Sequence, residues 1–204
     1  MRSHHRVSPW FLVLCLTVMS FSVPVDAATP VFINELHYDN TGADADEGVE
    51  IAGPAGTDLT GWRVRLYNGA TNLAYGVVVL SGFIPNQCNG FGTIWFPELG
   101  VQNGSPDGLA LVDAANNVIQ FLSYEGSFVA GDGEAVGLPS TDIGVSEASD
   151  SPLGFSLQLG GVGSFYEDFT WAGSAAHSRD ACNNGQTFVG TVPVSKTTWG
   201  GVKA

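Results

Sequence analysis

Five carboxylates fall within twelve residues that contain no Lys or Arg: Asp39, Asp44, Asp46, Glu47 and Glu50. Like charges at this density repel one another, and a hard divalent cation with oxygen ligands would relieve the repulsion. We therefore treat these five residues as a candidate calcium site. Their spacing is not that of an EF-hand, which places acids at the first, third and fifth positions of its loop. A solvated acidic turn that keeps the protein in solution is the alternative interpretation.

Glu35 and His37 form a second group that could do chemistry. They lie two residues apart in an apolar stretch, so they would share one face of a strand. With Asp39 they could ligate zinc or another transition metal, and with Glu50 they could serve a small metal-dependent nuclease or phosphoesterase. The alternative is a Glu–His pair on the polar edge of a sheet. We favour the pair, because one His with scattered acids is a weak pattern for zinc.

The rest of the sequence lacks the motifs that mark a catalytic nucleophile or a phosphate-binding loop. After residue 27 the only histidines are His37 and His177, and there is no Gly-x-Ser-x-Gly motif. The glycines at 160, 161 and 163 lack the Lys that a P-loop requires. The sequence therefore predicts a protein that is not an enzyme, with the metal-dependent phosphoesterase as the alternative.

The N-terminal segment has the organisation of a secretory signal peptide. Arg2 and Arg6 precede an apolar stretch from Trp10 to Met19, and small residues precede a cleavage site near Ala27. The apolar stretch is shorter than the roughly 20 residues of a membrane-spanning helix. We expect a helix within a signal peptide at residues 1–27, cleavage, a secreted or periplasmic protein, and no membrane span afterwards.

Charge limits the partners of the mature chain. Residues 28–204 contain 19 acidic and 5 basic residues. Nucleic acids are bound mainly through clustered Lys and Arg, so direct nucleic-acid binding is not expected. An unknown protein or a polymer of the cell surface or extracellular space is the expected partner.

Two cysteines follow the signal segment, Cys88 and Cys182. Because an exported chain matures in an oxidising compartment and no metal-ligand spacing is present, we predict a disulfide between them. Two free thiols and a catalytic cysteine are the alternatives.

The mature chain reads as short strands separated by turn residues. In the stretch 61–67, Trp62, Val64 and Leu66 alternate with Arg63, Arg65 and Tyr67, which predicts a half-buried strand, and Asn68-Gly69 predicts a hairpin turn. Strands are also expected at 31–37, 75–80, 91–96, 108–112, 118–124, 155–159, 165–171 and 187–192, with one ending at 50–51 and a Gly-, Ser- and acid-rich connection at 130–152. Such spacing predicts an all-β sandwich or barrel over residues 28–192, followed by a tail at 193–204.

Several blocks of this sequence resemble bacterial lamin-tail-domain proteins. The blocks are INELHYDNTGADADEGVEIAG at 33–53, LTGWRVRLYNG at 59–69, QNGSPDGLALVD at 102–113 and FLSYEG at 121–126. The resemblance spans nearly the whole mature chain and implies an immunoglobulin-like β-sandwich. It also implies an exported domain that acts in attachment or targeting, alone or beside a hydrolase. The two cysteines are not features of that family, and these 204 residues carry no appended catalytic domain.

Together these observations predict an exported, non-catalytic interaction or targeting module, with a candidate calcium site. A carbohydrate-binding module is a further alternative. It would gain weight if the rings of Trp95, Tyr166 or Trp199 were exposed, because sugars stack on exposed aromatic rings.

Overall fold

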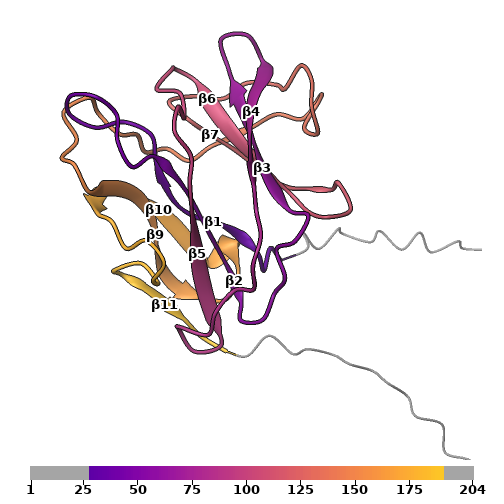
Figure 1. Ribbon diagram of the computed structural model, residues 1–204, viewed down its shortest axis with the longest axis vertical. Helices are drawn as coiled ribbons and strands as arrows, with labels where there is room; N and C mark the ends of the chain where they lie inside the picture. The colour runs from indigo at the N-terminus through magenta and orange to yellow at the C-terminus, as the bar shows by residue number, and fades with distance from the viewer. Residues whose placement is uncertain (1–27, 191–204) are drawn as a thin grey trace, which may run out of the picture.

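The computed structural model describes residues 28–190, which form two β-sheets packed face to face (Figure 1). The strands are β1 (Phe32–His37), β2 (Gly48–Pro54), β3 (Arg63–Asn68), β4 (Leu73–Val79), β5 (Phe91–Pro97), β6 (Asp107–Val112), β7 (Val118–Tyr124), β8 (Thr141–Asp142), β9 (Phe155–Gly163), β10 (Phe169–Ala176) and β11 (Gln186–Phe188). The one helical element among these residues is the 3₁₀ turn η1 (Tyr166–Asp168). The predicted all-β sandwich is confirmed.

The first sheet has the order β10-β9-β1-β2-β5, and β11 pairs in parallel with β9. The second sheet has the order β4-β3-β6-β7-β8. Except for β11 and β8, neighbouring strands are antiparallel. A sandwich of two largely antiparallel sheets agrees with the predicted architecture, and its assignment as immunoglobulin-like stays a prediction.

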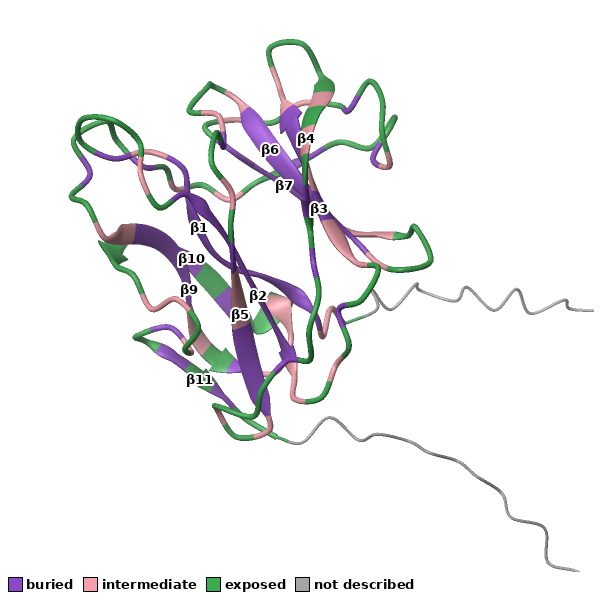
Figure 2. Ribbon diagram, in the orientation of Figure 1, coloured by how far each residue is buried: buried purple, intermediate pink, exposed green. Residues whose placement is uncertain are grey.

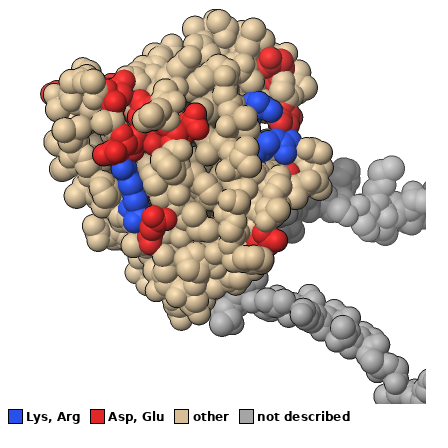
Figure 3. All heavy atoms as spheres, in the orientation of Figure 1, with Lys and Arg blue, Asp and Glu red and all other residues tan. Residues whose placement is uncertain are grey.

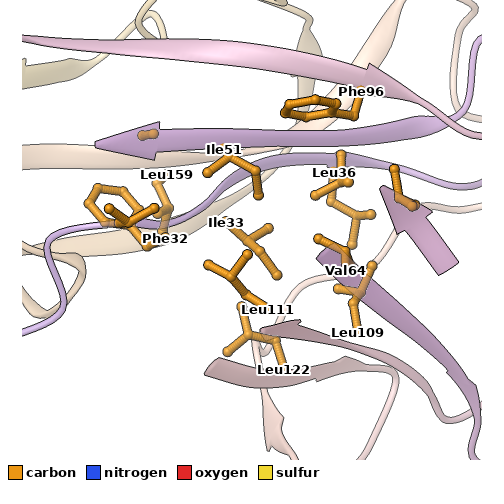
Figure 4. Packing of buried hydrophobic residues seen from close by; sticks show 14 of the residues in the cluster. Phe32, Ile33, Leu36, Ile51, Val64, Phe96, Leu109, Leu111, Leu122 and Leu159 are labelled. Atoms are coloured by element: carbon orange, nitrogen blue, oxygen red, sulfur yellow. The ribbon is translucent and has the colours of Figure 1, made fainter. Parts of the chain in front are cut away.

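The core lies between the two sheets and is filled by side chains that alternate along the strands. Figure 4 shows Ile33 and Leu36 of β1 and Ile51 of β2 facing Val64 and Leu111 of the second sheet. In β3 the alternation is as predicted: Val64 and Leu66 face this core, and Tyr67 faces a smaller cluster on the opposite side. Purple strands and green loops in Figure 2 show the same division between buried and exposed residues.

The hairpin predicted at Asn68-Gly69 is confirmed, because β3 and β4 pair antiparallel on either side of it. Asn68-Gly69 does not form a two-residue turn, because the Asn68 Oδ1 accepts the Thr71 N–H at 3.0 Å and the Gly69 N–H donates to the Pro106 carbonyl at 3.0 Å. The connection therefore extends to Asn72.

The strand expected at 165–171 starts at Phe169 instead. The Asp168 carboxylate accepts the N–H groups of Ser164 and Phe165 at 2.8 and 2.9 Å, which folds the preceding residues into η1. The segment 130–152, expected to be a plain connection, contains β8.

The disulfide between Cys88 and Cys182 is present, and it joins residues 94 positions apart. In residues 28–190 no helix is long and apolar enough to cross a membrane. The predicted signal peptide at 1–27 and tail at 193–204 lie outside the described residues.

Candidate functional site

The outer face of the first sheet, which points away from the core, carries most of the polar residues singled out above. Leu36 and Ile51 point into the core, so their neighbours Glu35, His37 and Glu50 point outward. A β-bulge between Ile33 and Glu35 places Asn34 on the outward side as well. Glu35 and Glu50 are directly opposite each other on β1 and β2.

Glu35 and Glu50 are buried beneath the connection between β10 and β11, and His37 is enclosed by Glu147, Asn40 and Ala45. We call this connection, His177–Gly185, the covering segment. The Asp180 N–H donates to Glu50 Oε2 at 2.7 Å, and the Ser178 hydroxyl lies 2.9 Å from Glu35 Oε2. Cys182 ties the same segment to Cys88. The exposed fraction of Glu35, His37 and Glu50 is 0%, so the pair is not on the polar edge that the sequence suggested.

The buried polar groups bond mainly to one another. We call them the outer-face network: Asn34, Glu35, His37, Glu50, Glu147, Ser156, Gln158, Ser178, Arg179 and Asn183. The Asn34 amide donates to Glu50 Oε1 at 2.9 Å, and the Asn183 amide donates to the Asn34 and Leu159 carbonyls at 3.0 and 2.9 Å. Burial, together with the charge of Glu35, raises the pKa of Glu50 to about 8 despite these hydrogen bonds. Glu50 therefore holds a proton at neutral pH.

Arg179 brings a positive charge to the network from the covering segment. Its Cζ lies 4.3 Å from the centre of the Trp95 ring, a cation–π contact. Burial lowers its pKa, while the charges of Glu35, Asp46 and Glu147 act in the opposite direction. Its Nε and Nη2 are buried and have no hydrogen-bond partner within residues 28–190. Arg179 therefore acts as a counter-ion to several carboxylates without bonding directly to one.

His37 is held between hydrogen-bond acceptors on both sides of its ring. Nδ1 lies 2.9 Å from the Glu147 carboxylate, and Nε2 lies 3.1 Å from the Ala45 carbonyl. Because both partners accept, both ring nitrogens donate, which is the pattern of the protonated imidazole. Burial lowers the pKa of His37, but the hydrogen bond and charge of Glu147 outweigh it and leave the pKa above its usual value. A protonated, doubly bonded imidazole has no lone pair for a metal or a substrate proton.

The structure separates the five carboxylates of the candidate calcium site. Glu50 belongs to the outer-face network, and Glu47 is buried and accepts the N–H groups of Gly100 and Val101. Asp44 and Asp46 are exposed, and Asp39 is half-buried. Burial raises the pKa of Asp39, and the charge of Asp44 adds to the rise.

These positions bear on the calcium hypothesis. Within residues 28–190, no three His, Cys, Asp or Glu side chains are gathered as a metal site requires. The structure therefore does not gather the five carboxylates at one point, and calcium binding by Asp39, Asp44, Asp46, Glu47 and Glu50 stays a prediction. Glu35, His37 and Asp39 are likewise not gathered as a zinc site.

The aromatic residues of the carbohydrate alternative are partly covered. Trp95 is half-buried beneath Arg179, and the Tyr166 hydroxyl accepts the indole N–H of Trp171 at 3.1 Å. Trp199 lies outside the described residues. His177, the second histidine, is exposed and lies beside Gly154. Unlike His37, it is not a member of the outer-face network.

Sequence reasoning found Glu35, His37 and Glu50 and missed the other members of the network, among them Glu147, Arg179 and Asn183. Glu147 sits in the acid-rich connection 130–152, where nothing in its neighbourhood distinguishes it from the exposed acids around it. Arg179 did carry a signal. An isolated Arg in a strongly acidic chain is a natural internal counter-ion.

Comparison with known proteins gave no relative for this fold and network. No family model, no curated protein and no solved structure matches the chain. The lamin-tail resemblance rests on the sequence blocks alone.

Proposed function

We propose that this chain is an exported β-sandwich module of the lamin-tail type that binds or targets and does not turn over a substrate. The observation that carries the proposal is the state of Glu35, His37 and Glu50. All three are buried and hydrogen-bonded within the outer-face network. Groups that are buried and engaged in these hydrogen bonds are not free to transfer protons to a ligand.

The rival function is that of a metal-dependent nuclease or phosphoesterase using Glu35, His37, Asp39 and Glu50. Such an enzyme needs a neutral imidazole or free carboxylates that reach a metal ion and a substrate. His37 donates through both nitrogens instead, and Glu50 holds a proton at neutral pH. The acidic surface would also repel a phosphate backbone.

An activity assay separates the two functions. The mature protein is incubated with single- and double-stranded DNA, RNA and a phosphomonoester, with Mg²⁺ or Ca²⁺, beside the variants His37→Gln and His177→Gln. We expect no turnover from any of the three proteins. Turnover that His37→Gln abolishes and His177→Gln retains would overturn the proposal, since His177 is exposed and lies outside the network.

Capture experiments address the binding partner. Immobilised mature protein is exposed to native culture supernatant and envelope fractions, and separately to insoluble glycans. We expect retention of a protein or an envelope polymer, weakened by competition with free module. Specific retention on glycans would favour the carbohydrate-binding alternative, and the absence of any specific retention would count against a binding module.

A further inference from the structure

A narrow groove runs along the side of the sandwich, where the first half of β7 borders η1. It holds about 250 Å³ and is lined by Ile119, Gln120, Phe121, Thr141, Tyr166 and Glu167, among others. Known small-molecule pockets typically occupy 300–1,000 Å³. The volume therefore suits a few side chains of an extended peptide better than a whole small molecule.

The wall of this groove contains an open strand edge. β8 pairs with β7 only at Leu122 and Ser123, and no other described strand lies on that side of β7. The Ile143 N–H donates to the Ser123 carbonyl, so the main-chain groups of Ser123 point toward β8. Phe121, two residues earlier, has the same orientation, and its N–H lies beyond the β8 pairing. An extended peptide can add to such an edge.

Within residues 28–190, Gln120 supplies an unpaired side-chain donor at the same place. Its Oε1 accepts the Ile33 N–H of β1 at 2.8 Å, but its Nε2 has no partner among the described residues. The residue is 93% buried, since its exposed fraction is 7%. A buried amide group without a partner is costly, so an acceptor in the groove would stabilise this region.

The described chain ends close to the wall of this groove. Ser164 donates its hydroxyl to the Val189 carbonyl, and Ser164 is two residues from Tyr166 in the groove wall. Fourteen residues, 191–204, follow Gly190 in this sequence. At about 3.3–3.6 Å per residue they can reach about 46–50 Å, far more than the groove requires. Tethering of this kind gives an effective concentration in the millimolar range, so weak contacts suffice.

Charge and composition favour this segment as the occupant. Residues 28–190 contain 19 acidic and 3 basic residues, a formal charge of −16, whereas residues 191–204 contain Lys196 and Lys203 and no acid. Glu167 lies in the groove wall, and its carboxylate accepts from the N–H and hydroxyl of Thr29, just before β1. The run TVPVS at 191–195 is rich in β-branched residues, and its Pro is tolerated in a strand paired on one side only.

We propose that residues 191–204 dock as an extended segment in the groove between β7 and η1. The segment adds main-chain hydrogen bonds to the open edge at Phe121, supplies an acceptor for the Gln120 amide, and brings Lys196 to the acidic groove wall. The C-terminal segment is then an internal strand of the sandwich that a competing peptide can displace.

Hydrogen exchange of the mature chain tests the docking. We compare it with the charge-reversed Lys196→Glu/Lys203→Glu variant and with the charge-conserving Lys196→Arg/Lys203→Arg variant. We expect the Phe121 amide to exchange at least about tenfold more slowly in the unchanged and charge-conserving proteins, equivalent to about 1.4 kcal/mol of closing free energy. Random-coil exchange rates throughout 191–204 in the unchanged protein would overturn the proposal.

Zero-length carbodiimide cross-linking of a 1:1 mixture of ¹⁵N-labelled and unlabelled protein identifies the occupant. We expect Lys196 joined to Glu167, the one carboxylate among the described residues that line the groove, within one isotopic species. Cross-links that join labelled to unlabelled chains would assign the groove to a second copy instead, and cross-links from Lys196 to distant carboxylates only would place the segment elsewhere. Either result overturns the proposal.

Discussion

The buried pair of His37 and Glu147 gives the sharpest test of the outer-face network. The Glu147 carboxylate accepts from His37 Nδ1 at 2.9 Å and from the N–H groups of Tyr38 and Asp39 at 2.7 and 3.0 Å. Glu147→Gln removes the negative charge of this side chain. It also turns the amide NH₂ of the new side chain toward the N–H donors that the carboxylate accepted. Because breaking a buried ion pair leaves an uncompensated charge, we expect a loss of about 3–5 kcal/mol of unfolding free energy near pH 6.

The dependence on pH identifies the imidazolium as the cause. A histidine whose pKa in the folded state lies above its unfolded value of about 6.5 stabilises the fold. Its contribution is complete when the pH is below the unfolded pKa. The contribution is lost as the pH rises through the raised pKa of His37. The coupling energy between His37 and Glu147 should therefore be largest near pH 6 and should shrink toward pH 9.

Urea unfolding of four proteins measures this coupling: the unchanged chain, His37→Gln, Glu147→Gln and the double variant, each from pH 5 to 9. The exposed His177→Gln variant is the matched control, and we expect it to leave the pH profile unchanged. A coupling energy below about 0.5 kcal/mol at pH 6, or one that does not vary with pH, would refute the assignment of a buried imidazolium–carboxylate pair.

Three further outcomes test other parts of the molecule. Burial raises the pKa of Glu50 to about 8, so the unchanged protein should lose stability between about pH 4.5 and 8, by up to about 5 kcal/mol, and Glu50→Gln should remove this loss in pH-dependent unfolding. Replacing Cys88 and Cys182 by Ser should lower the unfolding free energy by about 4–5 kcal/mol, and non-reducing mass spectrometry should find the two peptides joined in the unchanged protein. Under the calcium hypothesis, Ca²⁺ at 100 times its dissociation constant should add about 2.7 kcal/mol over EDTA, and an unchanged Tm ends that hypothesis.

The fold was accessible from the sequence because period-two alternation and turn residues are local signals. The β3 alternation of Val64 and Leu66 with Arg65 and Tyr67 is confirmed residue by residue. The strand at 118–124 also has the predicted bounds. The hairpin predicted at Asn68-Gly69 is present between β3 and β4. Its loop extends to Asn72, and local signals could not show this, because the Gly69 N–H donates to the distant Pro106 carbonyl.

The site was less accessible, because its members come from five segments that are distant in the sequence. The spacing of Glu35 and His37 correctly placed both on one face of a strand. Nothing in the spacing could show that the covering segment buries this face, since that depends on where β10 ends and on the Cys88–Cys182 link. The five acids were grouped by proximity in sequence, but the start of β2 at Gly48 divides them.

The placement of the three Arg residues in the described chain limits the chemistry of a partner. Arg63 and Arg65 both bond to Glu134, at 2.7 and 2.9 Å, and this bonding lowers the pKa of Glu134 to about 2. Arg179 lies over the outer-face network. In the view of Figure 3 the basic atoms likewise form small groups with carboxylates beside them.

The basic groups of residues 28–190 thus neutralise carboxylates within the sandwich, and the remaining acids determine the surface charge. A partner that binds this surface through charge must be cationic, and its capture should weaken steeply between low and physiological salt because exposed charges are screened. A partner held by strand addition or apolar contact would keep its affinity, since those contacts carry no net charge. The salt dependence of capture therefore distinguishes the two modes of binding before the partner is identified.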